Sequence, residues 1–91
     1  MKTTVVNLRK EKYDVYIGRG SKFGNPFKIG QDGTREEVIV KFHWYFHAKL
    51  ARDKEFLKIV LTLKGKKLGC YCKPLACHGD EIVTFVDNYE E

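Results

Sequence analysis

No apolar run in this 91-residue chain approaches the ~20 residues that a membrane-spanning helix needs, so no membrane role is expected. The N-terminus has neither the apolar stretch nor the cleavage site of a signal peptide, which predicts a cytoplasmic protein. Linkers, repeats and low-complexity tracts are missing, so residues 1–91 are expected to form a single domain. Only three cysteines are present, all between residues 70 and 77, which argues against the disulfide framework of a secreted protein.

The charge is positive and unevenly placed. Hydrophobic residues make up 43% of the chain and aromatic residues 13%, as in folded proteins, while the formal net charge is +5. Residues 1–30 alone carry +5, whereas residues 65–91 carry −2. The basic residues of the first part are Arg9, Lys10, Lys12, Arg19, Lys22, Lys28 and Lys2. Such a field attracts phosphates or nucleic acid, although ordinary surface lysines explain it equally well.

Hydrophobic periodicity predicts three strands and three helices. The strands are expected at residues 3–8, 13–17 and 66–72, where β-branched or alternating apolar residues occur. The helices are expected to begin at Thr34, which opens a capping box with Glu37, at Asp53, and at Asp80. Gly65 stands where a C-cap glycine is expected. The predicted fold is α/β, with a small three-stranded, partly parallel sheet flanked by three helices in the order β-β-α-α-β-α.

The element order predicts where a site should form. About fifty residues containing helices separate the second and third strands, so these strands are expected to be parallel with a right-handed crossover. Ligands of open α/β sheets bind beyond the carboxyl ends of the strands. The segment 18–27, called the glycine loop below, follows the second strand, and the segment 70–80, called the cysteine segment, follows the third. The two segments are therefore expected to meet at one edge of the sheet.

The glycine loop has the composition of an anion-binding turn. Glycines allow backbone amides to converge on one point, and an arginine can hold a phosphate with two hydrogen bonds. Neither a Walker loop nor a dinucleotide fingerprint is present. Phe23 and Phe27 could stack on a base, or could simply fill the core of a glycine-rich turn. The predicted ligand-binding residues are Gly18, Arg19, Gly20, Ser21 and Asn25.

Three interpretations of the cysteine segment remain open. In the first, Cys70, Cys72, Cys77 and His78 form a Cys₃His zinc site, with tighter spacing than is usual. In the second, Cys72 or Cys77 is a thiolate nucleophile, stabilised by a helix N-terminus and assisted by His78. In the third, the cysteines are small buried residues and His78 only caps the last helix. Cys70 and Cys72 are expected on one face of the same strand.

A histidine pair lies outside both motifs. His43 and His47 are four residues apart on the first predicted helix, so they share a face, as metal-binding histidine pairs do. The metalloprotease version of this pair requires glutamate after the first histidine, and here Trp44 occupies that position. Both histidines are therefore expected to be ordinary residues of a helix surface.

The two motifs together support a family resemblance. Gly-Arg-Gly-Ser-x-aromatic-Gly-Asn-Pro-Phe at residues 18–27, and Cys-x-Cys-x-Pro-x-x-Cys-His-Gly at residues 70–79, resemble an uncharacterised domain family of bacteria, archaea and their viruses. The opening Val-Val-Asn-Leu-Arg fits as well. The resemblance implies that both motifs belong to one site and that the protein has a phage or viral origin. It implies no activity, because the family is a domain of unknown function.

The functional expectation is a cleft, between the glycine loop and the cysteine segment, that binds a nucleotide or another phosphorylated ligand. Whether catalysis follows stays open; its candidate residues are Cys72, Cys77 and His78. One alternative is a non-catalytic, zinc-stabilised module that binds nucleic acid. A second is a small viral protein that binds a host partner through an aromatic surface, as a dimer, in the host cytoplasm.

Overall fold

A computed structural model describes residues 2–89, and it contains the expected elements in the expected order. The strands are β1 (Thr4–Asn7), β2 (Val15–Tyr16) and β3 (Lys67–Cys70). The helices are α1 (Arg35–Arg52), α2 (Lys54–Leu61) and α3 (Gly79–Asn88). The prediction of an α/β fold with the order β-β-α-α-β-α is confirmed, and each strand is shorter than its apolar pattern suggested.

The sheet has the strand order β1-β3-β2, and both pairings are parallel. The expected parallel pairing of β2 with β3 is therefore confirmed, and β1 is parallel to β3 as well. Val5, Leu68 and Val15 are aligned across the three strands and pack against the core. Because all strands run the same way, their carboxyl ends meet at one edge of the sheet.

Side-chain caps fix the starts of α1 and α2. Thr34 and Glu37 form the expected capping box, in which the Glu37 amide donates to Thr34 Oγ1 (3.2 Å) and the Thr34 amide donates to Glu37 Oε1 (2.9 Å). Asp53 caps α2 by accepting a hydrogen bond from the Phe56 amide (3.1 Å). The predicted end of this helix at Gly65 is wrong, since α2 ends at Leu61 and a turn follows it.

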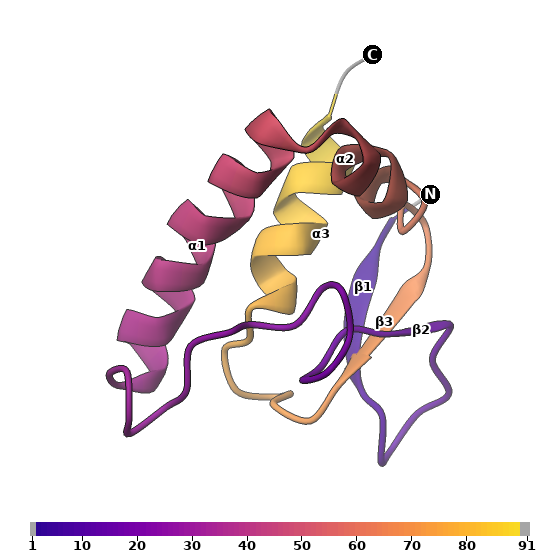
Figure 1. The fold of residues 1–91 in the computed structure, drawn as a ribbon. Helices are drawn as coiled ribbons and strands as arrows, with labels where there is room; N and C mark the ends of the chain where they lie inside the picture. Colours follow the sequence, from indigo (N-terminus) through magenta and orange to yellow (C-terminus); the bar gives the residue numbers. More distant parts are fainter. Residues whose placement is uncertain (1, 90–91) are drawn as a thin grey trace.

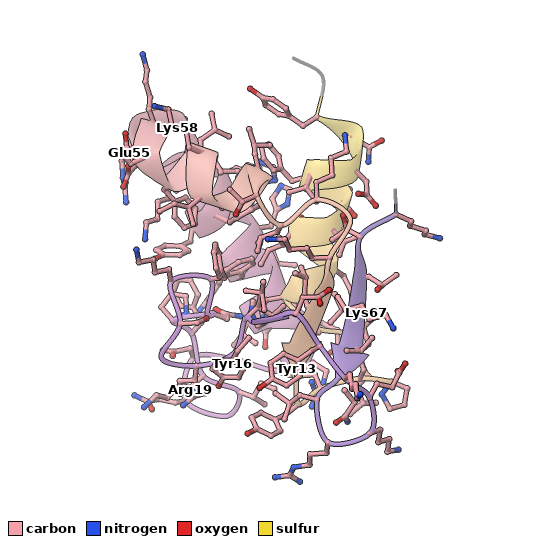
Figure 2. All side chains as sticks on the ribbon, turned by 90° about the vertical axis from the view of Figure 1, so that its right-hand side faces the viewer. Tyr13, Tyr16, Arg19, Glu55, Lys58 and Lys67 are labelled. Atoms are coloured by element: carbon pink, nitrogen blue, oxygen red, sulfur yellow. The ribbon has the colours of Figure 1, made fainter. Side chains whose placement is uncertain are left out.

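The helices form one layer and the sheet a second. Figure 1 shows α1 and α3 side by side, with the strands to one side of them, and the strands lie in front of the helices in the perpendicular view of Figure 2. The buried apolar stripe of α1 consists of Val38, Phe42, Phe46 and Leu50. Ile82 and Val86 of α3 and Leu68 of β3 complete the centre of the core. Within residues 2–89, no helix is both long and apolar enough to span a membrane.

Candidate functional site: a cleft beside three thiols

The glycine loop and the cysteine segment line one cleft at the carboxyl edge of the sheet. The cleft has a volume of about 290 Å³. It is lined by Gly18, Arg19, Asn25, Phe27, Ile29, Arg35, Val38, Ile39, Cys70, Tyr71, Cys72, Ala76, Cys77 and His78. The expected meeting of the two segments therefore occurs, with the first turns of α1 supplying a third wall.

His78 holds the two segments together. Its imidazole is buried, and Nε2 lies 2.7 Å from the carbonyl oxygen of Ile17, the residue before the glycine loop. A carbonyl only accepts, so Nε2 carries the proton and Nδ1 is left as an acceptor, 3.5 Å from Cys77 Sγ. Burial lowers the pKa of His78 and keeps the ring neutral. Although His78 stands at the N-cap of α3, its side chain makes no capping hydrogen bond, so it does not act as a helix cap.

Internal hydrogen bonds and close backbone contacts shape the glycine loop. The Ser21 hydroxyl donates to the Gly18 carbonyl (2.7 Å) and accepts from the Phe23 amide (3.3 Å). Gly20 has φ +91°, a conformation that other residues adopt only with strain. At Gly24, a Cβ would lie 2.7 Å from the Gly18 carbonyl oxygen, so the backbone of the loop approaches itself too closely for a side chain. Ser21 thus closes the loop rather than extending from it.

Three backbone amides of the glycine loop are available to donate hydrogen bonds to a ligand. Among residues 2–89, the amides of Gly18, Arg19 and Gly20 donate no hydrogen bond. Gly18 and Arg19 line the cleft. Donors of this kind, beside an arginine, are what an anion requires.

Asn25 attaches the loop to α1. Its Nδ2 donates to the Val38 carbonyl (3.1 Å), and its Oδ1 accepts from the Phe27 amide (2.9 Å). Both side-chain groups of Asn25 are therefore used to hold the loop in place. The two phenylalanines differ: Phe23 is buried against Phe56, which leaves no face for a base, whereas Phe27 is half-buried and lines the cleft.

Two arginines and a tyrosine line the rim of the cleft. Arg19 is exposed, and Figure 2 shows it beside Tyr16, at the opposite end of the molecule from Glu55 and Lys58. The Tyr16 hydroxyl donates to the Arg19 carbonyl (2.9 Å), and the Tyr16 ring meets Tyr71 edge to face. Arg35, from the first turn of α1, donates from Nη1 to the Ala76 carbonyl (3.2 Å).

Sequence reasoning missed Arg35 and Tyr71. A signal for Arg35 did exist, because a positive charge in the first turn of a helix opposes the helix dipole and needs another reason to be there. Tyr71 gave no comparable signal, since an aromatic residue between two cysteines is compatible with either burial or exposure. Its side chain is exposed.

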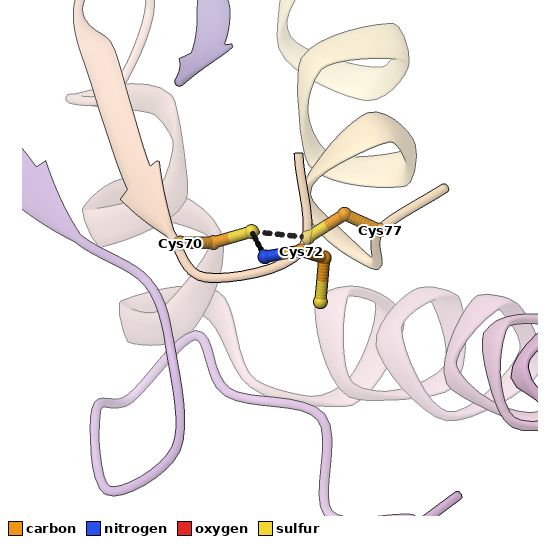
Figure 3. A group of neighbouring side chains, drawn as sticks. All are labelled: Cys70, Cys72 and Cys77. Atoms are coloured by element: carbon orange, nitrogen blue, oxygen red, sulfur yellow. Dashed lines mark hydrogen bonds between the residues drawn. The ribbon is translucent and has the colours of Figure 1, made fainter. Parts of the chain in front are cut away.

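The three thiols form one cluster, with Cys70 and Cys77 in direct contact. Their sulfurs are 2.7 Å apart, and the amide of Cys72 donates to Cys70 Sγ (3.2 Å). Figure 3 shows the Cys72 side chain pointing away from this pair. β3 ends at Cys70, so the expectation that Cys70 and Cys72 share a strand face is wrong. The turn after the strand sets the position of Cys72 instead.

The hydrogen bonds around Cys70 and Cys77 shift the pKa values of the two thiols in opposite directions. The thiol of Cys77 donates to Cys70, and with the amide of Cys72 this lowers the pKa of Cys70 to about 5. The same hydrogen bond and burial raise the pKa of Cys77. His78 Nδ1 lies 3.5 Å from Cys77 Sγ, so a neutral base stands beside the protonated thiol. The contact therefore favours the thiolate at Cys70 and the protonated thiol at Cys77.

The cluster offers three sulfur ligands to a metal ion. The sulfurs of Cys70, Cys72 and Cys77 all lie within 4.8 Å of one another. His78 is not a member of this group in the described part of the chain, and its Nε2 is committed to Ile17. A tetrahedral zinc ion with Zn–S bonds of ~2.3 Å requires sulfurs nearly 4 Å apart, so Cys70 and Cys77 would have to separate to hold one.

The fold and the site define a small α/β protein with a thiol-lined cleft at the carboxyl edge of its sheet. The chain belongs to the family described as Domain of unknown function (DUF4326), which matches residues 2–88. It is 42% identical over 85 residues to an uncharacterised 12.4 kDa protein from the nrdA-td intergenic region of Enterobacteria phage T4. That alignment covers 91% of this chain and 76% of the phage protein. No solved structure matches the chain.

Proposed function

We propose that the cleft binds a nucleotide or another phosphorylated small molecule. The observation that carries the proposal is that the glycine loop and the cysteine segment, far apart in the sequence, both line one cleft. Arg19, Arg35 and the available loop amides supply positive charge and hydrogen-bond donors at its rim. Phe27, Ile39 and Tyr71 supply flat or apolar surface, so the cleft combines groups suited to a phosphate with groups suited to a base.

A second, basic hollow is further evidence for an anionic ligand. It has a volume of about 280 Å³ and shares Arg19 and Asn25 with the main cleft. Its other charged residues are all basic, namely Lys22, Lys28 and Lys49. Adjacent hollows that share an arginine suit a ligand with more than one charged group, such as a nucleoside polyphosphate.

The direct test is Arg19→Ala against Arg52→Ala, an exposed arginine that lines neither hollow. A panel of nucleoside mono- and triphosphates with inorganic pyrophosphate is first screened by thermal shift, and the binding ligand is then titrated by calorimetry. Loss of a charged hydrogen bond is expected to weaken binding by about 1.5–3 kcal/mol, or at least ~10-fold in Kd, in Arg19→Ala only. Equal affinity in both variants, or no stabilising compound in the panel, would contradict the proposal.

The thiol cluster favours a second candidate, a zinc-stabilised module that binds nucleic acid through the basic first third of the chain. On this candidate, elemental mass spectrometry of untagged protein finds one equivalent of zinc, and a thiol reagent reaches the three cysteines only after chelation. Chelation should then lower Tm, because metal binding contributes to the free energy of folding. Metal-free protein with three titratable thiols and an unchanged Tm in chelator would eliminate this candidate and leave the first untouched.

A further inference from the structure

His43, His47 and Glu81 form a second cluster of metal-binding groups, in the seam between α1 and α3. His43 and His47 lie one helical turn apart on α1, with their ring centroids 4.6 Å apart. Glu81 belongs to the first turn of α3, the helix that lies beside α1 in Figure 1, and its Oε2 lies 2.8 Å from His43 Nδ1. One donor atom from each residue lies within 4.8 Å of the other two.

The donors are chemically suited to a divalent transition metal. Two imidazoles and one carboxylate from two helices are a ligand set used by zinc, cobalt, nickel and iron(II), with the remaining positions left to water or an external ligand. Imidazole must be neutral to bind. Burial, with the neighbouring His43, lowers the pKa of His47, which favours the neutral ring. The His43 and Glu81 side chains are 39% and 27% exposed, so solvent reaches the cluster.

Aromatic rings support the histidines from the side. The His43 ring meets Trp44 nearly perpendicularly at 5.0 Å between centroids. The His47 ring packs edge to face with Phe46 (5.5 Å between centroids) and with Phe85 (5.9 Å). Rings packed in this way lose little further freedom when a metal binds, which favours a preformed site.

We propose that His43, His47 and Glu81 bind a divalent transition metal ion that links α1 to α3. The simpler alternative is an ion pair between His43 and Glu81. That pair accounts for two of the residues but not for the placement of the His47 ring against the same carboxylate and imidazole. The proposed site uses none of the thiols, and it does not depend on the function of the cleft.

The test uses Trp44, the chain's single tryptophan, which touches His43. Cobalt(II) or nickel(II), both open-shell ions that quench indole fluorescence, is titrated into chelator-stripped protein. The expected result is saturable quenching with one equivalent, and at least ~10-fold weaker binding in His47→Ala and Glu81→Gln. Glu55→Gln, which changes an exposed carboxylate of α2, is the matched control and should bind as the wild type does.

Two measurements separate this site from the thiol cluster. Cobalt bound to thiolate gives a sulfur-to-metal charge-transfer band in the near ultraviolet, which histidine and carboxylate ligands do not produce. Quenching that saturates without this band, and that persists in Cys70→Ser, supports the proposal. The proposal is overturned if quenching does not saturate, if His47→Ala and Glu81→Gln bind like Glu55→Gln, or if quenching and the thiolate band appear together and are lost in Cys70→Ser.

Discussion

His78→Ala is expected to lower the free energy of unfolding by roughly 2–4 kcal/mol, a large share of the stability of so small a domain. The substitution leaves the Ile17 carbonyl without its buried donor and removes a ring that packs edge to face on Phe42 at 5.0 Å. It also separates the glycine loop from the cysteine segment, so ligand binding in the cleft should weaken with stability. Urea unfolding followed by circular dichroism measures the first effect.

The matched control is His47→Ala, a histidine that is only half-buried, measured in the presence of chelator. Its expected cost is under about 1 kcal/mol. If His78→Ala is too unstable to study, His78→Gln provides the comparison, because its amide can still donate to a carbonyl, and it should be more stable than His78→Ala. Equal midpoints for His78→Ala and His47→Ala would show that the contact between His78 and Ile17 does not hold the two segments together.

The second large effect is a dependence of stability on pH that originates in the Cys70–Cys77 pair. The pKa of Cys70 in the folded protein, about 5, lies below its value in the unfolded chain. The stability that ionised Cys70 contributes is therefore fully present above the unfolded pKa and is lost as the pH falls toward 5. The free energy of unfolding of metal-free protein should therefore rise from pH 7 to 8.5, by at most about 1.4 kcal/mol per pH unit.

The rise in the free energy of unfolding should stop when the pH reaches the ordinary thiol pKa of about 8.5. Above it the unfolded chain releases the protons of both cysteines, whereas the folded protein retains the proton of Cys77, whose pKa is raised. Stability should then decline, which gives a maximum. His47 and His78, whose pKa values are lowered by burial, also make stability rise with pH, but only below about pH 7, where unfolded histidine is protonated. The range from pH 7 to 8.5 therefore isolates the thiols.

Chemical denaturation at intervals of half a pH unit, with chelator and reductant present, gives the slope. Cys70→Ser should remove the rise, because serine does not ionise, folded Cys77 keeps its proton, and unfolded Cys77 begins to lose its proton only near the upper end of this range. Cys72→Ser, whose thiol lies outside the pair in Figure 3, should retain most of it. A wild-type slope no steeper than that of Cys70→Ser would mean that the two thiols titrate alike in the folded and unfolded protein.

The parts of this structure that sequence reasoning predicted depend on local or topological rules. Thr34 and Asp53 begin helices because their side chains satisfy amides two or three residues away, which the sequence alone reveals. The meeting of the glycine loop and the cysteine segment follows from the parallel alignment of β2 and β3, which the length of their connection implies.

The parts that were not predicted depend on which way a side chain turns. The composition around Ser21 suits either a hydroxyl that faces a ligand or one that closes its own loop, and only the structure shows the bond to Gly18. Glu81 lies beside His43 because of the way α3 packs along α1, and no pattern within either helix encodes that contact. For the same reason, the rim position of Arg35 required the structure.

The strand order has a consequence for how the protein is made. β3 lies between β1 and β2, yet it is the last of the three strands within residues 2–89. Any nascent chain or fragment that ends before Lys67 contains both edge strands and no strand to join them. It also lacks the cysteine segment, and with it His78, which contacts the residue before the glycine loop. Sheet and cleft must therefore be completed together, once β3 and the cysteine segment are present, and a truncation before Lys67 should remove both at once rather than leave a smaller folded core.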